Sequence, residues 1–134
     1  MRLKKDEAEF VKQSRVVRVA TADSRGEPHA VPVCHVWEGG QVWFATAKTT
    51  RKVRNLQQNP QVALIFDDYT DVWKYLRGLL LQGKAEVVES GPTYRRVRKL
   101  LYAKYPQYEE MEPLEEGESV FVRVTPEKAV SWGL

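Results

Sequence analysis

The sequence contains a single cysteine among its 134 residues, so an internal disulfide is excluded. It also has no apolar run approaching the roughly 20 residues that a membrane helix needs. Its first residues are charged and lack the apolar core of a signal peptide. Chains without disulfides are typical of reducing compartments. We therefore expect a cytoplasmic protein that does not enter a membrane.

Motifs for metal-dependent and hydrolytic catalysis are also missing: there is no HExxH, no CxxC pair and no carboxylate dyad. Cys34 and His35 are adjacent, but neighbours on a strand point to opposite faces and do not form a nucleophile and base. His29 and His35 would share a face of one strand, yet lie roughly 20 Å apart. We predict no metal site, name no catalytic residue and expect Cys34 to be a packed side chain.

The charge is nearly balanced, with a formal net charge of +3. Basic residues gather within 95–104, and an acidic block follows within 109–118. This alternation favours solvated or mutually paired faces over a continuous nucleic-acid surface. Trp37, Trp43 and Phe44 lie near basic residues and would suit a stacking platform for a single strand, but such aromatics more often belong to a core or a dimer interface. We expect no nucleic-acid partner.

The chain is long enough for one domain, residues 1–134. Segments of alternating apolar and polar residues, separated by glycine and proline turns, predict mostly antiparallel strands. The expected strands are 15–22, 29–37, 41–45, 61–67, 76–89, 119–124 and 128–132, and the expected helices are 6–13, 50–59 and one between Pro92 and Pro106. The first three strands would form a meander, and the long strand 76–89 would bend near Gly78 or Gly83.

This pattern predicts a mainly β fold: a small closed or split antiparallel β-barrel with about three peripheral helices. Residues 68–75 are expected to form a loop with a helical turn. The acidic connector 108–118 is expected to be exposed. A turn at 125–127 would separate the last two strands.

Residues 45–56 are the most informative stretch, because hydroxyls and cations gather where a strand ends and a helix begins. A helix N-terminus has unpaired N–H groups and a partial positive charge, so it attracts phosphate. Thr49 or Thr50 would cap this helix, and Arg51 and Lys52 would add charged hydrogen bonds to an anion. The alternative is a capped surface helix with a solvated basic face.

Pro32 interrupts the second expected strand. Proline cannot donate to a ladder, so this backbone lies at an edge, at a bulge or against something that is not a strand. One interpretation is a flat ligand resting on the residues from Ala30 to Val33. The other is that Pro32 protects an edge strand from pairing.

Several segments together resemble the pyridoxamine 5′-phosphate oxidase-like superfamily of flavin-binding split barrels. They are residues 17–23, residues 26–33, Thr46, Thr50-Arg51-Lys52 and Asn59-Pro60. The resemblance covers nearly the whole chain. Residues 67–69, Trp73, residues 105–108 and residues 131–134 resemble a subgroup labelled probable deazaflavin-dependent enzymes.

This resemblance implies a homodimer with two cofactor sites at the subunit interface and a small-molecule substrate. It implies that Arg51 and Lys52 hold the phosphate of FMN, with Thr50 as a further donor. Thr46 would contact the phosphoribityl chain or the ring edge, and Trp132 would approach from the partner subunit. The strand that would line the isoalloxazine, partly through main-chain groups, consists of His29, Ala30, Val31, Pro32 and Val33.

The chain departs from pyridoxamine phosphate oxidases proper at three positions that the resemblance identifies. His29 replaces an arginine, Cys34 replaces a lysine, and a glutamine on the long strand falls at Gly78. The C-terminal strands also lack the residues that hold the substrate's phosphate. Vitamin B6 oxidation is therefore not expected. The resemblance extends to the cofactor-binding residues but not to the substrate-binding residues.

Three functions remain open from the sequence. The first is an FMN-dependent oxidoreductase, in which the protein orients the cofactor and tunes its electronics. The second is a reductase using the deazaflavin coenzyme F420, whose longer acidic tail would favour extra basic residues such as Lys48 and Arg54. The third is a non-catalytic flavin- or haem-binding module, with the two histidines as candidate haem ligands.

Overall fold

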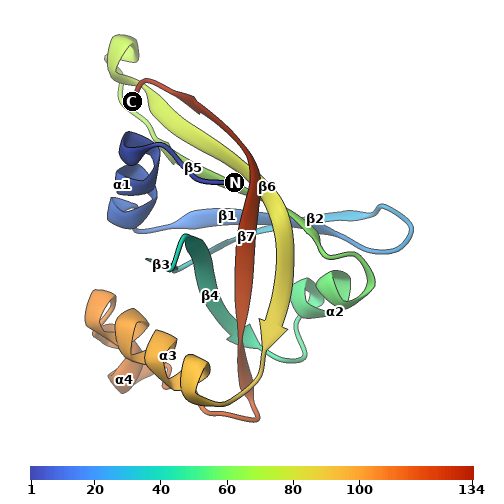
Figure 1. Ribbon diagram of the computed structural model, residues 1–134. Coiled ribbons are helices and arrows are strands. Elements are labelled where there is room, and N and C mark those ends of the chain that lie inside the picture. The colour runs from blue at the N-terminus through green and yellow to red at the C-terminus, as the bar shows by residue number, and fades with distance from the viewer.

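The computed structural model describes all residues, 1–134, and shows a mainly β protein built on one seven-stranded antiparallel sheet (Figure 1). The strand order across the sheet is β2-β1-β5-β6-β7-β4-β3. The strands are β1 (Val17–Ala22), β2 (Pro28–Val33), β3 (Val36–Glu38), β4 (Gln41–Ala47), β5 (Gln61–Asp68), β6 (Arg77–Val88) and β7 (Ser119–Trp132). The helices are α1 (Lys5–Gln13), α2 (Arg51–Gln58), α3 (Pro92–Lys104), α4 (Gln107–Met111) and the short 3-10 helix η1 (Trp73–Tyr75).

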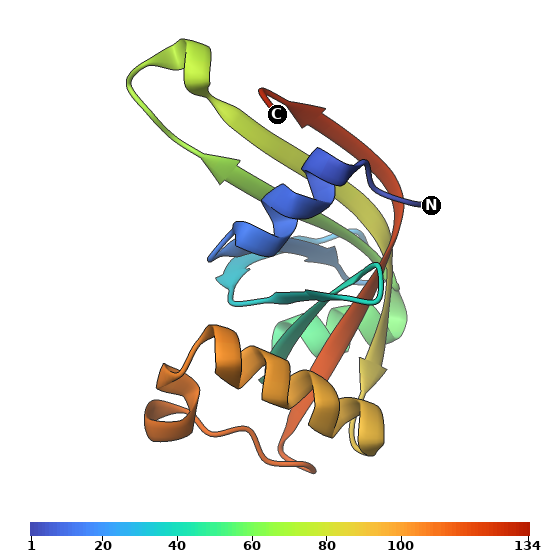
Figure 2. The ribbon, with the colours of Figure 1, turned by 60° about the vertical axis from the view of Figure 1, so that its left-hand side comes forward.

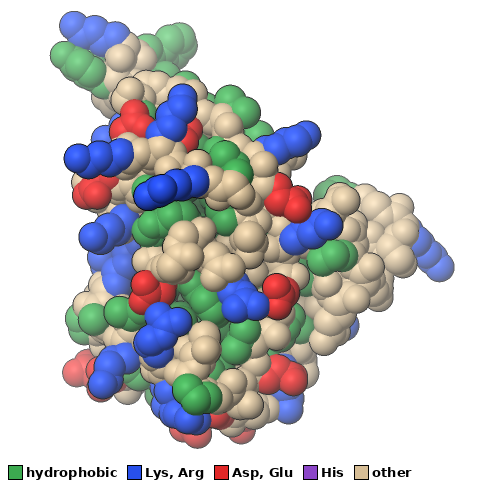
Figure 3. Space-filling model, in the orientation of Figure 1, with side chains coloured by type: hydrophobic (Ala, Val, Ile, Leu, Met, Phe, Trp, Pro, Cys, Tyr) green, Lys and Arg blue, Asp and Glu red, His purple; other side chains and the backbone are tan.

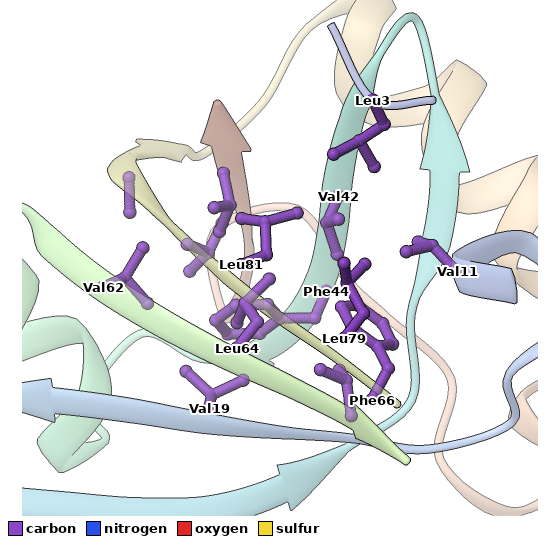
Figure 4. Close-up of a cluster of buried hydrophobic side chains, with 14 of the residues drawn as sticks. Leu3, Val11, Val19, Val42, Phe44, Val62, Leu64, Phe66, Leu79 and Leu81 are labelled. Carbon is purple, nitrogen blue, oxygen red and sulfur yellow. The ribbon is translucent and has the colours of Figure 1, made fainter. Parts of the chain in front are cut away.

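The sheet curls around a single main core, which makes it a split barrel. Side chains from β1 and from β4, near opposite ends of the strand order, belong to the same buried cluster, as Val19 and Phe44 illustrate (Figure 4). The long strands β6 and β7 form the curved wall between them. Nearly every strand turns one face toward this core, as the alternation of apolar and polar residues predicted. The sheet therefore closes on itself.

A second, smaller core lies under α3. Tyr94, Val97, Leu101 and Tyr105 form the apolar side of this helix, and all four pack with Trp43 and Phe121 in one buried cluster. The sequence predicted this helix and its apolar side. It did not predict α4, which occupies part of the acidic connector, nor the burial of Leu114 within it. The chain therefore has four α-helices where about three were expected.

The second predicted strand, 29–37, is wrong as one continuous element. It breaks at Cys34–His35, so that β2 pairs with β1 and β3 pairs with β4. The predicted three-strand meander does not form either, because β2 and β3 lie at opposite ends of the strand order. At this break His35 is fully buried and donates from Nε2 to the Val11 carbonyl of α1 at 2.8 Å. This break leaves β2 as a free edge.

The two predicted C-terminal strands are also a single strand, β7. Pro126 does not end it, because a register shift between Gln82 and Gly83 on β6 accommodates the proline opposite Gly83. A side chain at Gly83 would come within 2.1 Å of the Thr125 carbonyl, so only glycine allows this close approach. Of the two positions expected to interrupt this strand, Gly78 and Gly83, the register shift lies at Gly83. No helix has the length and hydropathy required to cross a membrane.

The buried His35 makes stability depend on pH. Burial, opposed in part by the bond to Val11, lowers the pKa of His35 from 6.5 to about 4. Between pH 6.5 and about 4, His35 therefore binds a proton in the unfolded chain but not in the folded chain. We expect this group to leave stability unchanged above pH 6.5 and to reduce the free energy of unfolding by about 3 kcal/mol as pH falls to 4.

The measurement is a ring NMR titration of His35 together with denaturant unfolding at each pH. His35→Phe removes the titrating group, so the variant should show a flatter pH dependence than the natural protein over the same range. A titration midpoint for His35 above pH 6 would contradict the prediction.

Candidate functional site

The corner between the end of β4 and the start of α2 brings together most of the predicted phosphate-binding residues. Figure 1 shows α2 lying between the β1–β2 hairpin and the end of β4. A tight turn makes this corner, with the Thr50 N–H donating to the Ala47 carbonyl at 3.2 Å. Because α2 begins at Arg51, the cations of its first turn lie beside the hydroxyls of the turn.

The hydroxyls of Thr46 and Thr50 form a short chain of hydrogen bonds. Thr50 Oγ1 donates to the Ala47 carbonyl at 3.0 Å and lies 3.1 Å from Thr46 Oγ1. Thr50 occupies the N-cap position of α2, as predicted, but its side chain caps no helix N–H. The predicted side-chain cap is therefore absent. The first N–H groups of α2 have no partner within the helix, which leaves them available to an anion.

Arg51 is turned toward the β1–β2 hairpin. One of its terminal nitrogens lies 3.4 Å from a Glu27 oxygen and 3.8 Å from an Asp23 oxygen, and its Nε donates to the Asn55 side-chain oxygen at 3.3 Å. These are long, partly exposed contacts, and such ion pairs are weak. Arg51 therefore lies near the corner without a strong ion pair.

Lys52 is the half-buried lysine of this corner, and it has no counter-charge. It is half-buried and takes part in no ion pair and no side-chain hydrogen bond. Burial lowers the pKa of its ammonium. A charge that loses water without gaining a partner is unfavourable, so this position favours an incoming anion.

A buried polar contact fixes α2 against the sheet. Asn55, only 2% exposed, donates from Nδ2 to the hydroxyl of Thr21 on β1 at 3.0 Å. Thr21 pairs with His29 across the β1–β2 ladder, so both side chains lie on the face toward α2. His29 Nδ1 is buried and has no hydrogen-bond partner. An orphaned ring nitrogen therefore lies on the strand next to the cationic corner.

β2 lies at an edge of the sheet, as the edge-strand interpretation of Pro32 requires. Its side chains alternate: His29, Val31 and Val33 are half-buried, whereas Ala30 and Pro32 are exposed. The five residues predicted to line a ring therefore divide between two faces. His29, Val31 and Val33 face the inside of the barrel. Ala30 and Pro32 point outward, so on the inner side they can offer a ligand only their main-chain groups.

Trp132 does not join this site within one chain. It lies at the far end of β7 from Val120, the residue that pairs with Thr46, and 12 residues of strand span roughly 40 Å. Figures 1 and 2 show this end of β7 beside the β5–β6 loop, with α3 at the opposite end. Trp132 packs its ring over Gly78 and remains 44% exposed. Trp132 of the same chain therefore does not reach the corner.

The structure also decides between the interpretations of the other singled-out residues. Trp43 and Phe44 are 2% and 0% exposed, so they belong to the core and offer no stacking platform. Arg95 and Arg96 on α3 pair with Glu116 and Glu38. On the face shown in Figure 3, basic and acidic side chains are intermingled without a continuous basic stripe. No group of three or more histidine, cysteine or acidic side chains has metal-binding geometry.

Sequence reasoning missed the residues that fix the corner: Asp23, Glu27, Thr21 and Asn55. Asn55 lies four residues after Arg51 on one helix face, and this spacing was a usable signal. The contacts to Asp23 and Glu27 join a turn and a helix that are distant in sequence, and no local pattern indicates them.

Comparisons with known proteins agree with this geometry. The family model for pyridoxamine 5′-phosphate oxidase matches residues 3–133. No curated protein sequence matches the chain. Among solved structures, a conserved hypothetical protein of Mycobacterium tuberculosis is 28% identical, with a TM-score of 0.84 over 97% of this chain and 84% of that one.

Two further structures share the fold at lower identity. HutZ, the haem-storage protein of Vibrio cholerae, is 20% identical with a TM-score of 0.79 over 97% of this chain and 94% of its own. An F420 reductase is 23% identical with a TM-score of 0.73 over 96% of this chain and 98% of its own. At these identities the likeness shows the split-barrel fold.

Asn55→Ala tests how α2 is fixed. The change leaves the buried Thr21 hydroxyl without its partner, so we expect the free energy of unfolding to fall by about 1–3 kcal/mol in denaturant titrations. Gln57→Ala, an exposed change on the same helix, is the control and should stay within about 0.5 kcal/mol of the natural protein. Equal effects for the two variants would show that the Asn55–Thr21 bond does not hold the helix.

Proposed function

Since the chain belongs to the pyridoxamine 5′-phosphate oxidase family, we propose that it is an oxidoreductase that binds FMN. The observation that carries this proposal is the unpaired, half-buried Lys52 at an uncapped helix start, beside the hydroxyls of Thr46 and Thr50. A phosphate at this corner gains charged hydrogen bonds and helix N–H groups in one place.

In this proposal the phosphate is held by Lys52, Thr50, Thr46 and the first N–H groups of α2. Arg51 moves its guanidinium from Asp23 and Glu27 to the phosphate. Arg51 would give up two long, partly exposed ion pairs and would gain charged hydrogen bonds to a phosphate, which are stronger. The two carboxylates then act as a resting partner that keeps the arginine near the site.

The rings of the cofactor would lie along the inner face of β2. The buried, unpartnered His29 Nδ1 offers a hydrogen bond there, and Val31 and Val33 offer apolar contact. Ala30 and Pro32 would contribute main-chain groups of the free edge. Bound FMN supplies the hydride or electron transfer itself, and the protein's part is to orient it and exclude water. The chain therefore offers FMN a cation, two hydroxyls and a ring nitrogen without a hydrogen-bond partner.

We also propose a homodimer formed through the outer face of the sheet. Ladder pairing places Pro32, Arg18, Ile65, Leu80 and Val130 in one row across β2, β1, β5, β6 and β7. Arg18 pairs with Asp67, and the other four residues are apolar. Val130 is 61% exposed although its ladder neighbour Leu80 is apolar. A second copy seated on this face would bury the row.

Coenzyme F420 is the second candidate cofactor. The exposed Lys48 in the turn before α2 favours it, because a longer acidic tail would leave the corner along this side. The F420 reductase that shares the fold is consistent with this alternative. Competition between FMN and F420 in one titration separates the two.

A haem-binding module is less well supported, although HutZ shares the fold. His35 is fully buried and its Nε2 is engaged by Val11, so it is not available as a ligand. Vitamin B6 oxidation is disfavoured at Gly78, where a side chain would come within 2.3 Å of the Trp132 ring. A glutamine cannot occupy that position without displacing the tryptophan.

Lys52→Ala tests the phosphate site. We expect the variant to bind FMN at least tenfold more weakly, because it loses the unpaired cation of the corner, and Thr50→Val to weaken binding severalfold. The measurement is a titration followed by flavin fluorescence. Lys12→Ala, an exposed lysine on α1, is the matched control. Unchanged affinity in Lys52→Ala, or no FMN binding by the natural protein, would refute the proposed site.

Leu80→Glu and Val130→Glu test the dimer. Each places a charge among the apolar residues of this row, so we expect a dimer of the natural protein to become monomeric in light scattering or analytical ultracentrifugation. Leu100→Glu on α3, also partly exposed, introduces the same charge away from the row and should leave the dimer intact. A natural protein that sediments as a monomer at all concentrations would contradict the assembly.

A further inference from the structure

A groove of about 510 Å³ lies between the C-terminal ends of α1 and α3, along the free edge of β3. Its lining includes the consecutive residues Val36, Trp37 and Glu38. Successive side chains of a strand point to opposite faces, so a groove that touches all three follows the edge of the strand. β3 is the last strand in the order and pairs only with β4, and Figure 2 shows it between α1 and α3. The groove therefore lies at an edge of the sheet that no other strand covers.

Two cations of this groove, Arg15 and Lys104, are held in place where the two helices end. Arg15 donates to the Lys104 carbonyl at 3.1 Å, and its guanidinium lies over the Tyr105 ring, 4.5 Å from the ring centre. Lys104 donates from Nζ to the Ser14 carbonyl at 2.7 Å. Each cation thus binds a carbonyl at the C-terminal end of the other helix. A ligand would meet both charges already in position.

The helix ends do not cancel the charge of the groove. The C-terminal end of a helix carries a charge of about −0.5, so two ends offset about one positive charge. Lys12, Arg15 and Lys104 line the groove, and none of them forms an ion pair. The one carboxylate of the lining, Glu38, pairs with Arg96 at 2.9 Å. The groove therefore keeps a positive charge of about two.

Lys104 carries its charge in a half-buried position. Burial, together with the charge of Arg15, lowers the pKa of its ammonium to about 8. A positive charge that has lost water and gained only a neutral carbonyl is unfavourable, so it attracts an anion. One of its three N–H donors and one of the five donors of Arg15 are used within the chain. The other donors are available to a ligand that brings negative charge.

Apolar side chains lie beside these cations in the groove. Trp37 is half-buried, and Leu100 on α3 is 37% exposed although its side chain is large and apolar. The groove has the volume of a site for a small organic molecule. An inorganic anion would contact only the cations, whereas an organic anion would also remove apolar surface from water.

The groove is independent of the sites proposed above. It shares no residue with the corner at α2, and the row of the proposed dimer crosses β2, β1, β5, β6 and β7 but neither β3 nor β4. What binds in the groove therefore does not depend on which cofactor the corner takes.

We propose that this groove is a second ligand site, which binds an organic carboxylate with one or two apolar rings. Arg15 and Lys104 hold the carboxylate, and Trp37 and Leu100 contact the rings. The planar guanidinium of Arg15 matches a carboxylate, which accepts two parallel hydrogen bonds from such a group. An uncharged molecule of the same shape would leave both cations without a counter-charge.

The binding of three probes to the full chain tests this proposal in a protein-observed NMR titration. 1-Naphthoate has a carboxylate and two rings, 1-naphthamide has the same rings without the charge, and acetate has the charge without the rings. We expect 1-naphthoate to bind at least tenfold more tightly than either of the other two and to shift the backbone signals of Arg15, Trp37 and Lys104 most. Equal affinity for 1-naphthoate and 1-naphthamide, or shifts centred elsewhere, would overturn the proposal.

Arg15→Gln and Lys104→Gln separate ligand binding from the capping of the helices. Glutamine can still donate to a carbonyl but carries no charge, so each variant should fold and should bind 1-naphthoate severalfold more weakly. Lys99→Gln changes an exposed lysine of α3 outside the groove, so this matched control should leave binding unchanged. If the two cations only cap the helices, neither variant will change the affinity, and that result would contradict the proposal.

Two further measurements locate the anion. Because the pKa of Lys104 is about 8, its charge is lost as pH rises above this value. The affinity for 1-naphthoate should therefore fall there in the natural protein but not in Lys104→Gln. Lys52→Ala should bind FMN more weakly but should bind 1-naphthoate as the natural protein does. Loss of 1-naphthoate binding in Lys52→Ala would place the anion at the corner of α2 and refute the groove as its site, while the proposal for FMN would stand.

Discussion

A buried hydrogen bond between the His35 ring and the Val11 carbonyl anchors the chain to α1 at the break between β2 and β3. On either side of this break the chain pairs with different strands, and β2 and β3 lie at opposite edges of the sheet. β2 is therefore a free edge, and it carries the buried His29 Nδ1 that has no hydrogen-bond partner.

Cations without a carboxylate partner lie at both ends of this open edge. At the α2 end, Lys52 lacks a counter-charge and the helix start lacks a cap, so the local balance favours a bound anion. At the α4 end, Arg15 and Lys104 donate to carbonyl groups and form no ion pair. The helix start differs because hydroxyls and free N–H groups lie beside its cation.

The elements that local pattern determines were predictable. The basic start of α2, the apolar side of α3 and the bend at Gly83 follow from spacing, periodicity and the lack of a side chain, and the structure has all three. The break at Cys34–His35 was not predictable, because the alternation of residues continues through it and no local pattern indicates the bond from His35 to Val11. Pro126 was predicted to lie in a turn. Instead it lies within β7, because Gly83 on the neighbouring strand leaves room for it. In the candidate site, the residues at the helix start could be named in advance, but Asp23 and Glu27 could not.

The same distinction explains why the fold by itself does not select a cofactor. Split barrels of this shape include an F420 reductase and a haem-storage protein, so the barrel sets only the position of the open edge. Selection depends on the few side chains that the edge presents. Here an engaged His35 disfavours haem, while an unpaired Lys52 favours a phosphate, and neither feature belongs to the barrel itself.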